Sequence, residues 1–246
     1  MKDNSLIIIP TYNEAENIKA VINKIFSLDD YHSILVVDDN SPDRTSNIVR
    51  NLKKNYDDQL FLITREKKDG LGSAYKEGFK WAIEKNFSYI FEMDADLSHD
   101  PNEIKKLKRM LVNGECDVAI GSRYLEGVSV VNWPLSRIFL SYFANIYVRL
   151  ITCMPVKDST SGFVGYKIEA LSSLDINKIK FNGYAFQIEM KFKLWEKKFK
   201  LKEHQIIFVN REQGESKMNK NIIFEAIIGV IKLKLNSILK KKWIDF

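Results

Sequence analysis

The chain has 246 residues, 45% of them hydrophobic, and a formal net charge of +6. This length suits one large α/β domain or two small ones, and the apolar fraction is that of a globular protein with a buried core. The two cysteines, Cys116 and Cys153, lie in apolar contexts, which argues against a disulfide framework or a cysteine-based zinc site and favours a reducing cytosol.

Apolar runs and helical patterns alternate over the first half of the chain. The apolar runs, which predict short buried strands, cover residues 6–9, 34–37, 60–63, 89–93 and 118–120. Helical periodicity lies between them, over residues 14–28, 42–56, 71–86 and 101–112. Asn13 with Glu16, and Ser41 with Pro42, are typical of helix N-termini. We therefore expect an α/β fold whose mostly parallel, Rossmann-like sheet carries helices on both faces.

The regular alternation stops after Gly121. Beyond it we expect an apolar helix over residues 133–151, a turn-rich stretch over 157–165, a helix over 186–198, a strand over 203–209 and a polar loop over 210–219. No repeat or low-complexity linker divides the chain. The sequence predicts one domain over residues 1–218, followed by a basic amphipathic helix over residues 219–246.

This C-terminal tail combines basic and apolar residues. Between Lys217 and Lys242 there are seven lysines and one acid, Glu225, interleaved with isoleucines and leucines. A helix of this composition can lie at the surface of an anionic membrane, or it can pack on the domain with its lysines in water, and both interpretations stay open. No recognition motif accompanies the charge, so we expect no nucleic-acid partner. We also expect neither a signal peptide nor a transmembrane helix, which needs roughly 20 apolar residues.

Asp94 and Asp96 end the apolar run at residues 89–93. Ligands of open α/β sheets bind beyond the carboxyl ends of strands, and Mg²⁺ and Mn²⁺ prefer carboxylate, water and phosphate oxygens. The two aspartates can therefore hold a divalent cation that carries the phosphates of a substrate. The simpler interpretation is a helix cap, but the cap signal at Asp100 and Pro101 explains neither Asp94 nor Asp96.

Three other predicted strands are also followed by polar clusters, at residues 10–14, 38–43 and 65–72. Parallel strands end at one edge of a sheet, so we expect these clusters and the two aspartates to line one crevice. Carboxylates such as Asp38 or Asp39 suit hydrogen bonds to ribose hydroxyls or base nitrogens, and Tyr12 offers a ring on which a base can stack.

The sequence lacks the motifs of several other classes of enzyme. The turn at residues 11–13 carries no glycine, so the fingerprint of dinucleotide-binding dehydrogenases fails, and no P-loop occurs. A serine or cysteine hydrolase needs a nucleophile elbow or a placed histidine, and the three histidines, His32, His99 and His204, are scattered along the chain.

Six segments carry a resemblance to a known family. They are Ile9-Pro10-Thr11-Tyr12-Asn13-Glu14, Asp38-Asp39-Asn40-Ser41-Pro42-Asp43, Gly70-Leu71-Gly72-Ser73-Ala74-Tyr75, Asp94-Ala95-Asp96-Leu97-Ser98-His99-Asp100-Pro101, Gly121-Ser122-Arg123-Tyr124 and Asp158-Ser159-Thr160-Ser161-Gly162-Phe163. Together they resemble the dolichol-phosphate mannose synthases, which belong to the inverting, GT-A-fold glycosyltransferase family 2. The opening and Asp-x-Asp segments imply a nucleotide-sugar transferase, and the later ones narrow the acceptor to a polyprenyl phosphate.

The resemblance, which runs from about residue 5 to about residue 218, implies GDP-mannose as the donor. The residues that match donor-binding positions are Pro10, Tyr12, Glu14, Asp39, Asp94, Ala95, Asp96, Arg211 and Lys217. Among them, Asp94 and Asp96 are expected to hold Mg²⁺ or Mn²⁺ on the diphosphate. Ser98 stands where some members place a further metal ligand, a glutamine. Arg211 and Lys217 match a loop that closes over the diphosphate.

The resemblance also implies an acceptor site and a catalytic set. Arg123, Arg137 and Ser141 match positions that bind the lipid phosphate, and Gln187 and Glu189 match positions near the sugar. The implied catalytic residues are Asp96, Arg123, Gln187 and Glu189. A polyprenyl or dolichyl phosphate is already an anionic nucleophile at pH 7, so the work of the protein is to position it and to neutralise the leaving diphosphate.

A lipid-borne acceptor implies contact with a membrane surface. Some members of the family carry C-terminal transmembrane helices, and this chain is similar to the shorter form. The residues expected to make the contact, besides the lysine-rich tail, are Trp133, Pro134, Leu135, Ile138, Phe139, Leu140 and Phe143. We expect a cytoplasmic protein, peripheral on the cytoplasmic face of the membrane, with small membrane subunits as further candidate partners.

Three alternatives stay open at this point. A polyprenyl-phosphate glucosyltransferase, or another family 2 enzyme, would use a UDP-sugar, because the choice of base and sugar depends on side chains that a sequence does not place. A non-catalytic membrane adaptor would have no need of the two aspartates or the basic closing loop. A nucleotidyltransferase would release pyrophosphate, and it typically has a glycine-rich loop after its first strand, which is absent here.

Overall fold

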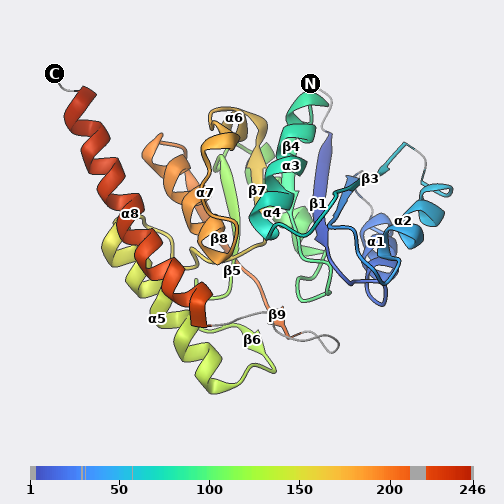
Figure 1. Cartoon of the computed structure of the whole chain (residues 1–246), viewed down its shortest axis with the longest axis horizontal. Helices are drawn as coiled ribbons and strands as arrows, with labels where there is room; N and C mark the ends of the chain where they lie inside the picture. The colour runs from blue at the N-terminus through green and yellow to red at the C-terminus, as the bar shows by residue number, and fades with distance from the viewer. Residues whose placement is uncertain (1–3, 29, 31, 57, 211–219, 245–246) are drawn as a thin grey trace.

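The computed structural model describes residues 4–28, 30, 32–56, 58–210 and 220–244 (Figure 1). The first half of the chain forms β1 (Ser5–Thr11), α1 (Ile18–Phe26), β2 (His32–Asp38), α2 (Thr45–Lys53), β3 (Leu60–Thr64), α3 (Leu71–Glu84), β4 (Tyr89–Glu92), α4 (Glu103–Val112) and β5 (Val118–Ser122). The second half forms β6 (Val130–Val131), α5 (Leu135–Thr152), β7 (Val164–Lys167), α6 (Ile168–Ser172), the short 3₁₀ helix η1 (Ile176–Lys178), α7 (Tyr184–Glu196), β8 (Leu201–Gln205), β9 (Phe208–Val209) and α8 (Lys220–Ile244).

Seven strands form one sheet in the order β3-β2-β1-β4-β7-β5-β8. Every neighbouring pair is parallel except the pairs of β7, which runs antiparallel to both β4 and β5. A separate pair joins β6 to β9. The predicted α/β fold with a mostly parallel sheet is confirmed.

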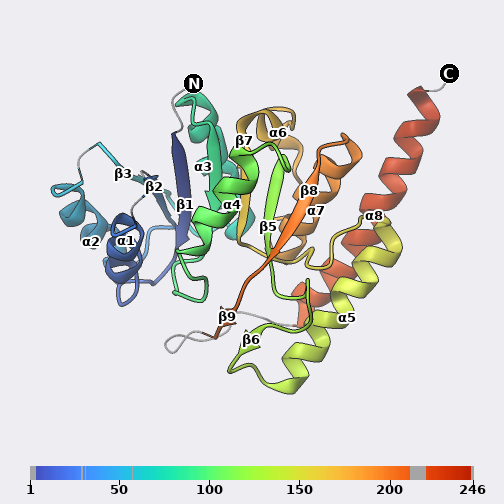
Figure 2. The same cartoon turned by 180° about the vertical axis from the view of Figure 1, so that it is seen from behind.

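The sheet has a core on each face because successive side chains of a strand point to opposite sides. On β1, Leu6 and Ile8 face one core, while Ile7 and Ile9 face the other, and all four are fully buried. Helices α3 and α7 cover the first face, and α1, α2 and α4 cover the second (Figures 1 and 2). Two packed faces hold the strand ends, and the loops that follow them, in fixed positions.

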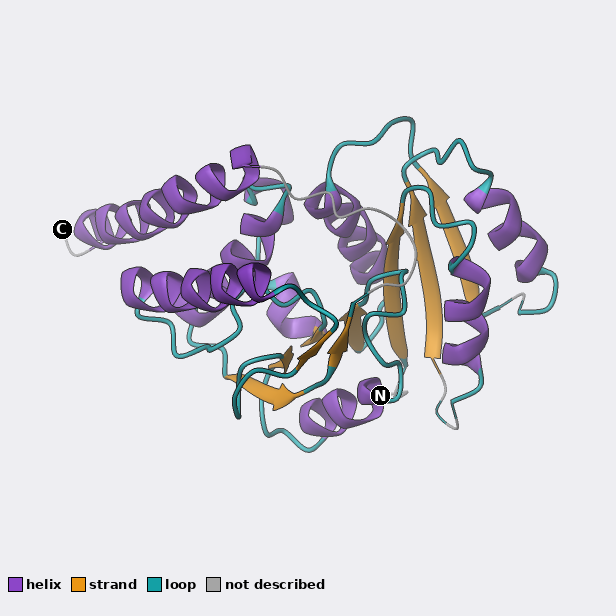
Figure 3. Cartoon of the chain, turned by 90° about the horizontal axis from the view of Figure 1, so that it is seen from below, coloured by secondary structure: helices purple, strands orange, loops and turns teal. Residues whose placement is uncertain are grey.

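Helices α5 and α8 lie side by side at one end of the molecule (Figures 1 and 3). Within the predicted tail, the described residues form α8, which packs on α5 and α7 through Val230, Leu233 and Ser237. The opposite side of α8 stays exposed and is also apolar, as Ile231 and Leu235 show. Among the described residues, no helix combines the length and apolarity that crossing a membrane requires.

Two predicted elements differ from the structure. The strand expected over residues 203–209 is divided, because β8 ends at Gln205 alongside β5 while β9 leaves the sheet to pair with β6. The antiparallel strand β7 was not predicted, because it follows a run of serine, threonine and glycine that indicates turns. Helices α5 and α7 appear where they were expected, with ends shifted by one or two residues.

Candidate active site

The carboxyl ends of β1, β2, β3 and β4 meet at one edge of the sheet, as the sequence predicts. Hydrogen bonds join the loops that follow these strands. Thr11 Oγ1 donates to Asp38 Oδ1 over 2.8 Å, and the backbone N–H of Asn13 donates to Ser41 Oγ over 3.0 Å. The loops after β1 and β2 are therefore held relative to one another, and Arg65, after β3, bonds to Asp39 in the second of them.

Tyr12 and Asp39 occupy the β1–β2 side of this edge. Lys68 Nζ lies 4.0 Å from the centroid of the Tyr12 ring, which is a cation–π contact. Asp39 is 6% exposed, and its Oδ1 accepts a hydrogen bond from Arg65 Nη1 over 2.8 Å. Burial raises the pKa of Asp39 above its ordinary value, although the guanidinium of Arg65 opposes that shift. A ring beside a buried, paired carboxylate suits a base and its ribose.

Pro10 and Glu14 flank the same loop. Pro10 pairs in register with Val37 near the end of β1. The carboxylate of Glu14 accepts from Asn17 Nδ2 over 3.0 Å, and its carbonyl accepts from the backbone N–H of Ile18 over 2.9 Å, at the start of α1. Glu14 thus fixes the entry into α1 beside the Tyr12 ring.

Asp94, Ala95 and Asp96 follow β4 at the same edge. Asp96 Oδ1 accepts from the Ser98 hydroxyl over 2.5 Å and from the Ser98 backbone N–H over 3.1 Å. The backbone N–H of Asp94 donates to Nδ1 of the buried His99 over 3.5 Å. Burial lowers the pKa of His99 to about 4, although Asp96 opposes that shift, so the ring is neutral at pH 7 and can accept this bond.

The two aspartates fit a hard divalent cation by their chemistry and position. The Asp94 side chain is 35% exposed, and Asp96 is partly exposed, while Ala95 between them is buried. In the part of the chain that the structure describes, no group of three or more His, Cys, Asp or Glu side chains is placed to hold a metal ion. A cation on these carboxylates would take its remaining ligands from water and a diphosphate, as Mg²⁺ usually does.

The loop before β7 brings α7 close to these aspartates. A Cβ atom built on Gly162 would lie 3.9 Å from both Asp94 Oδ1 and Gln187 Nε2. Gln187 Nε2 and Asp94 Oδ1 therefore both border the space that a side chain at position 162 would fill. The resemblance placed Gln187 near the sugar, and the structure brings it next to the proposed metal site.

Gln187 also belongs to a cluster of four buried polar side chains, which we call the inner cluster. Its members are Glu92, Tyr166, Gln187 and Lys191. Glu92 Oε1 accepts from the Tyr166 hydroxyl over 3.0 Å, and Glu92 Oε2 accepts from Gln187 Nε2. Lys191 Nζ donates to Gln187 Oε1 over 3.2 Å and to the carbonyl of Ser161 over 2.7 Å. Burial raises the pKa of Glu92 to about 7 and lowers the pKa of Lys191 to about 8.

Glu189 supports the loop before α7. Its Oε2 accepts from the backbone N–H groups of Lys180 and Phe181 over 2.9 and 3.0 Å, and its Oε1 lies 2.7 Å from Lys193 Nζ. The side chain is buried. Glu189 therefore has three partners on the protein and holds the segment that leads to Gln187.

Arg123 lies at the end of β5 and pairs with the loop before β7. Its Nε and Nη2 donate to the two carboxylate oxygens of Asp158 over 2.7 and 2.6 Å, and Nη2 also donates to Thr160 Oγ1 over 2.8 Å. Asp158 is fully buried. Burial works to raise the pKa of Asp158, but the guanidinium and its hydrogen bonds outweigh it and hold that pKa below its ordinary value.

Arg137, Ser141 and Asn145 follow one another at four-residue spacing on α5 and so share one helix face. This face meets Arg123, since Asn145 Nδ2 and Arg123 Nη2 both donate to Thr160 Oγ1. The Arg137 guanidinium carbon lies 3.9 Å from the centroid of the Trp133 ring, and Arg123 lies 5.5 Å from that ring. The structure therefore brings together the three residues predicted for the acceptor phosphate.

Two predicted donor residues, Arg211 and Lys217, lie outside the described residues.

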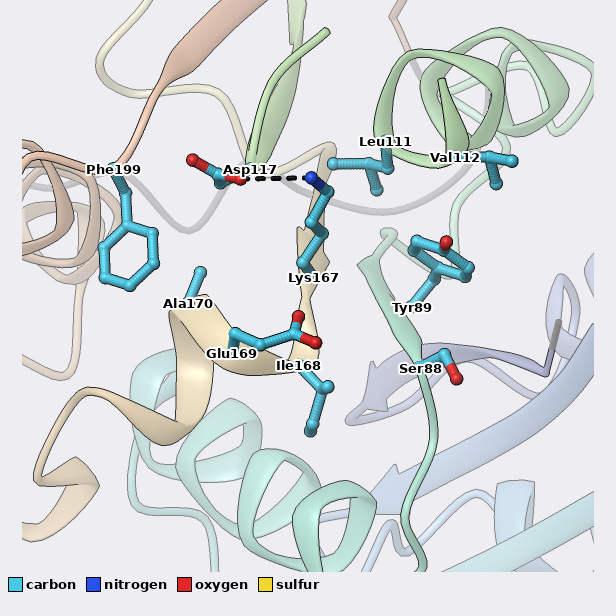
Figure 4. Close-up of a pocket in the computed structure, with 10 residues that line it drawn as sticks. All are labelled: Ser88, Tyr89, Leu111, Val112, Asp117, Lys167, Ile168, Glu169, Ala170 and Phe199. Carbon is cyan, nitrogen blue, oxygen red and sulfur yellow. Dashed lines mark hydrogen bonds and ion pairs between the residues drawn. The ribbon is translucent and has the colours of Figure 1, made fainter. Parts of the chain in front are cut away.

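A cavity of about 600 Å³ opens at the opposite edge of the sheet (Figure 4). It is lined by Ser88 and Tyr89 at the start of β4 and by Asp117 and Lys167, which form an ion pair of 3.1 Å. None of the predicted site residues lines it. The polar clusters predicted from the sequence follow the strands at the other edge of the sheet, where the parallel strands end.

Sequence reasoning did not assign roles to Arg65, Glu92, Asp158 or Lys191. Arg65 and Asp158 do lie inside segments that were singled out, so a search for the partners of Asp39 and Arg123 could have found them. Glu92 and Lys191 carry no such signal, because a single acid in a strand and a single lysine in a helix are indistinguishable from surface charges.

Comparisons with known proteins agree with this fold. Residues 6–175 match the family described as Glycosyl transferase family 2. The chain is 39% identical to the polyprenol monophosphomannose synthase of Mycolicibacterium smegmatis, over 92% of this chain and 85% of that protein. It is 37% identical to the undecaprenyl-phosphate mannosyltransferase of Micrococcus luteus, over 92% of each.

A third relative and a solved structure extend the comparison. The dolichol-phosphate mannosyltransferase of Pyrococcus furiosus is 37% identical over 92% of this chain, which spans 62% of that longer protein. The structure of glucosyl-3-phosphoglycerate synthase from Mycobacterium tuberculosis, in complex with Mn²⁺, UDP and glucosyl-3-phosphoglycerate, superposes with a TM-score of 0.68. It covers 96% of this chain and 80% of that one at 17% identity, which is a likeness of fold.

Fold and site together define a glycosyltransferase of the GT-A type. More narrowly, the chain belongs to glycosyl transferase family 2.

Proposed function

We propose that the protein transfers mannose from GDP-mannose to a dolichyl or other polyprenyl phosphate, with inversion at the anomeric carbon. The observation that carries this proposal is the position of Asp94 and Asp96 at the same sheet edge as Tyr12 and Asp39, with Asp94 and Gln187 both bordering Gly162. The names of the three relatives support both the sugar and the class of acceptor.

The donor lies along the sheet edge in this proposal. The base stacks on Tyr12 in the place that Lys68 occupies, the ribose meets Asp39, and the diphosphate reaches Asp94 and Asp96. Arg65 keeps Asp39 in place by donating to one of its oxygens. Pro10 and Ala95 border the donor as uncharged residues. Glu14 fixes the loop that joins β1 to α1.

Asp94 and Asp96 would hold a divalent cation, Mg²⁺ or Mn²⁺. When it is bound, such a cation neutralises the charge that develops on the leaving diphosphate. Ser98 stays in the proposed metal set, because a hydroxyl that donates its proton to Asp96 keeps lone pairs for a cation. His99 accepts from the backbone of Asp94 and so steadies the first ligand.

The acceptor phosphate binds at the face of α5 that carries Arg137 and Ser141, next to Arg123. A guanidinium stacked on Trp133 is well placed for a phosphate, because its planar fork can donate two parallel hydrogen bonds. Asp158 offsets much of the charge of Arg123, which therefore contributes shape and hydrogen bonds more than net attraction.

The phosphate of the acceptor attacks without the help of a strong general base, because it is already ionised at pH 7. Gln187 contacts the sugar of the donor in this proposal, and Glu189 holds the loop that presents Gln187. The contribution of the protein is to hold both substrates in line and to receive charge on the side of the leaving group.

We further propose that helices α5 and α8 rest on a membrane. Both expose apolar side chains: Leu135 is 71%, Phe139 57% and Phe143 60% exposed on α5, and Leu239 is 55% exposed on α8. Apolar side chains beside lysines suit the interface of an anionic bilayer. The phosphate site begins on the same helix α5, so a lipid acceptor would reach it directly. In this proposal the membrane contact is on the cytoplasmic face, and small membrane subunits are candidate partners.

The proposal is tested with a donor panel. Purified protein is incubated with polyprenyl phosphate, Mg²⁺ or Mn²⁺, and either GDP-mannose, UDP-glucose or another nucleotide sugar, and both lipid-linked sugar and free nucleotide are measured. We expect polyprenyl-phosphate β-mannose and GDP. Transfer from a UDP-sugar alone would make the protein a polyprenyl-phosphate glucosyltransferase or a related enzyme. Release of pyrophosphate would indicate a nucleotidyltransferase, and no turnover with any donor would indicate an adaptor.

A further inference from the structure

The inner cluster places two ionisable side chains in a position where ionised groups are costly. Glu92 and Lys191 are both fully buried, one on β4 and the other on α7. Removing a charge from water is unfavourable by several kcal/mol even after relaxation, so such groups persist only with good partners or with a use. Between them stands the amide of Gln187, which bonds to both.

The two bonds determine which way the Gln187 amide points. Lys191 Nζ can only donate, so it selects the oxygen Oε1, which it reaches over 3.2 Å. Glu92 Oε2 accepts and so selects the nitrogen Nε2. An amide that was turned by 180° would set its nitrogen against an ammonium and its oxygen against a carboxylate, and both bonds would be lost.

The fixed orientation matters because Nε2 has two hydrogens. Glu92 takes one of them, and Nε2 lies, like Asp94 Oδ1, 3.9 Å from the position of a Cβ atom on Gly162. Nε2 therefore keeps a second N–H, on an atom that borders Gly162 as Asp94 Oδ1 does. Lys191 also donates to the carbonyl of Ser161, the residue before Gly162, and so holds the loop that separates the two groups.

We propose that Glu92 and Lys191 are positioning residues, which lock the Gln187 amide so that its second N–H is presented to an oxygen of the donor sugar. The inference rests on the proposed function, in which Gln187 contacts the sugar. Glu92 and Lys191 act through Gln187 and touch no substrate themselves.

The decisive variant replaces both ions at once, as Glu92→Leu/Lys191→Leu. Replacing both ions leaves no isolated buried charge, but the Tyr166 hydroxyl, the Gln187 amide and the Ser161 carbonyl lose partners, so urea unfolding must show that the variant is folded before its kcat is compared. If Glu92 and Lys191 position Gln187, kcat falls roughly tenfold to a hundredfold, to the value of Gln187→Leu, while KM for the donor changes little. Wild-type kcat in the double variant would overturn the proposal.

A triple variant distinguishes an effect through the Gln187 amide from an effect through the loop at Ser161. In the background Gln187→Leu, the pair Glu92→Leu/Lys191→Leu is expected to cause no further loss, because the effects of residues that act through one group are not additive. A further tenfold loss would show that the pair acts through the loop and would overturn the proposal. Tyr166→Phe is the matched control, because it removes the other hydrogen bond of Glu92 and leaves both bonds to Gln187, so kcat should stay within about twofold.

A measurement without turnover keeps this inference distinct from the proposed function. In a ¹H–¹⁵N spectrum of the full chain, the side-chain amide signal that Gln187→Leu removes should exchange slowly and stand apart from the other glutamines. In the double variant it should move to the position of an ordinary amide. An ordinary, fast-exchanging signal in the wild type would overturn the positioning role. Absence of transfer by the wild type, with the slow amide present, would instead count against the proposed function alone.

Discussion

Arg123 and Asp158 form a buried ion pair with two parallel hydrogen bonds, beside the face of α5 that carries Arg137. The pair joins the end of β5 to the loop before β7, and the backbone N–H of Arg123 adds a third bond to Asp158 Oδ2 over 2.9 Å. Because the pair is nearly neutral as a unit, we expect Arg123 to stabilise the architecture of the acceptor site and Arg137 to supply most of its attraction for a phosphate.

The first prediction concerns the stability of this pair. Arg123→Leu leaves Asp158 buried without its cation, so the free energy of unfolding should fall by roughly 3–5 kcal/mol. Urea unfolding followed by circular dichroism measures the change. The double variant Arg123→Leu/Asp158→Leu should recover most of the loss, because no isolated charge remains. A single variant within 1 kcal/mol of the wild type would mean that water reaches Asp158 after all.

The second prediction separates binding from folding at Arg137. Arg137→Leu should raise KM for the polyprenyl phosphate about tenfold or more, since a charge-assisted hydrogen bond contributes roughly 1.5–3 kcal/mol, and it should change stability little. Arg149→Leu, an exposed arginine in the last turn of the same helix, is the matched control. Equal effects of the two variants on KM would argue against a phosphate site at Arg137.

The core and the position of the site could be predicted from the sequence, because strands such as residues 6–9 are continuous apolar runs, and parallel strands place their ends on one edge. The helix starts could not. Asn13 has a φ of 59° and does not cap α1, and the Ser41 hydroxyl donates to Asp38 rather than capping α2. Both residues bind across the strand-end loops, and such contacts are visible only after the strands are side by side.

Within the site, motif residues were predicted and their partners were not. Asp94 and Asp96 stand out because two acids close a buried strand. Glu92 belongs to the strand itself, and its partner Lys191 lies far along the chain, on a helix that reaches it only because β7 and α7 pack beside β4. A buried pair formed by tertiary contact leaves no local pattern in the sequence.

The third prediction tests the metal site. Asp96→Ala should abolish transfer, because the cation loses one of its two carboxylate ligands, while the thermal midpoint stays close to that of the wild type, since Asp96 is partly exposed. Glu84→Ala is a control, because this exposed acid lies at the far end of α3 from the site. Near-normal turnover of Asp96→Ala over a series of Mg²⁺ and Mn²⁺ concentrations would remove the metal assignment.

The fourth prediction tests the membrane surface. Phe143→Glu should weaken sedimentation with anionic phospholipid vesicles severalfold, because a carboxylate replaces an exposed aromatic ring and repels the headgroups. Val112→Glu, at an exposed apolar position at the end of α4, should bind vesicles like the wild type. The wild type should also bind less as salt is raised, because the attraction of lysines is screened. Vesicle binding by neither protein at low salt would contradict the proposed surface.

The last prediction concerns pH and stability at His32, far from the site. His32 is buried at the start of β2, with Nδ1 2.7 Å from Ser5 Oγ and Nε2 3.5 Å from Asp30. Burial lowers its pKa to about 4; the charge of Asp30 opposes this shift, and the charge of Lys108 adds to it.

Between a pKa of about 4 and the ordinary value of 6.5, the unfolded chain binds a proton at His32 that the folded protein does not bind. The free energy of unfolding should therefore fall as pH is lowered through this window, by about 1.4 kcal/mol per pH unit for this group. Urea unfolding of His32→Gln between pH 7 and pH 4 should show a slope that differs from the wild-type slope by that amount. Other groups contribute to both slopes, among them His99, whose pKa is lowered, and Glu92, whose pKa is raised and whose contribution has the opposite sign. Parallel slopes for variant and wild type would mean that His32 takes up its proton in the folded protein.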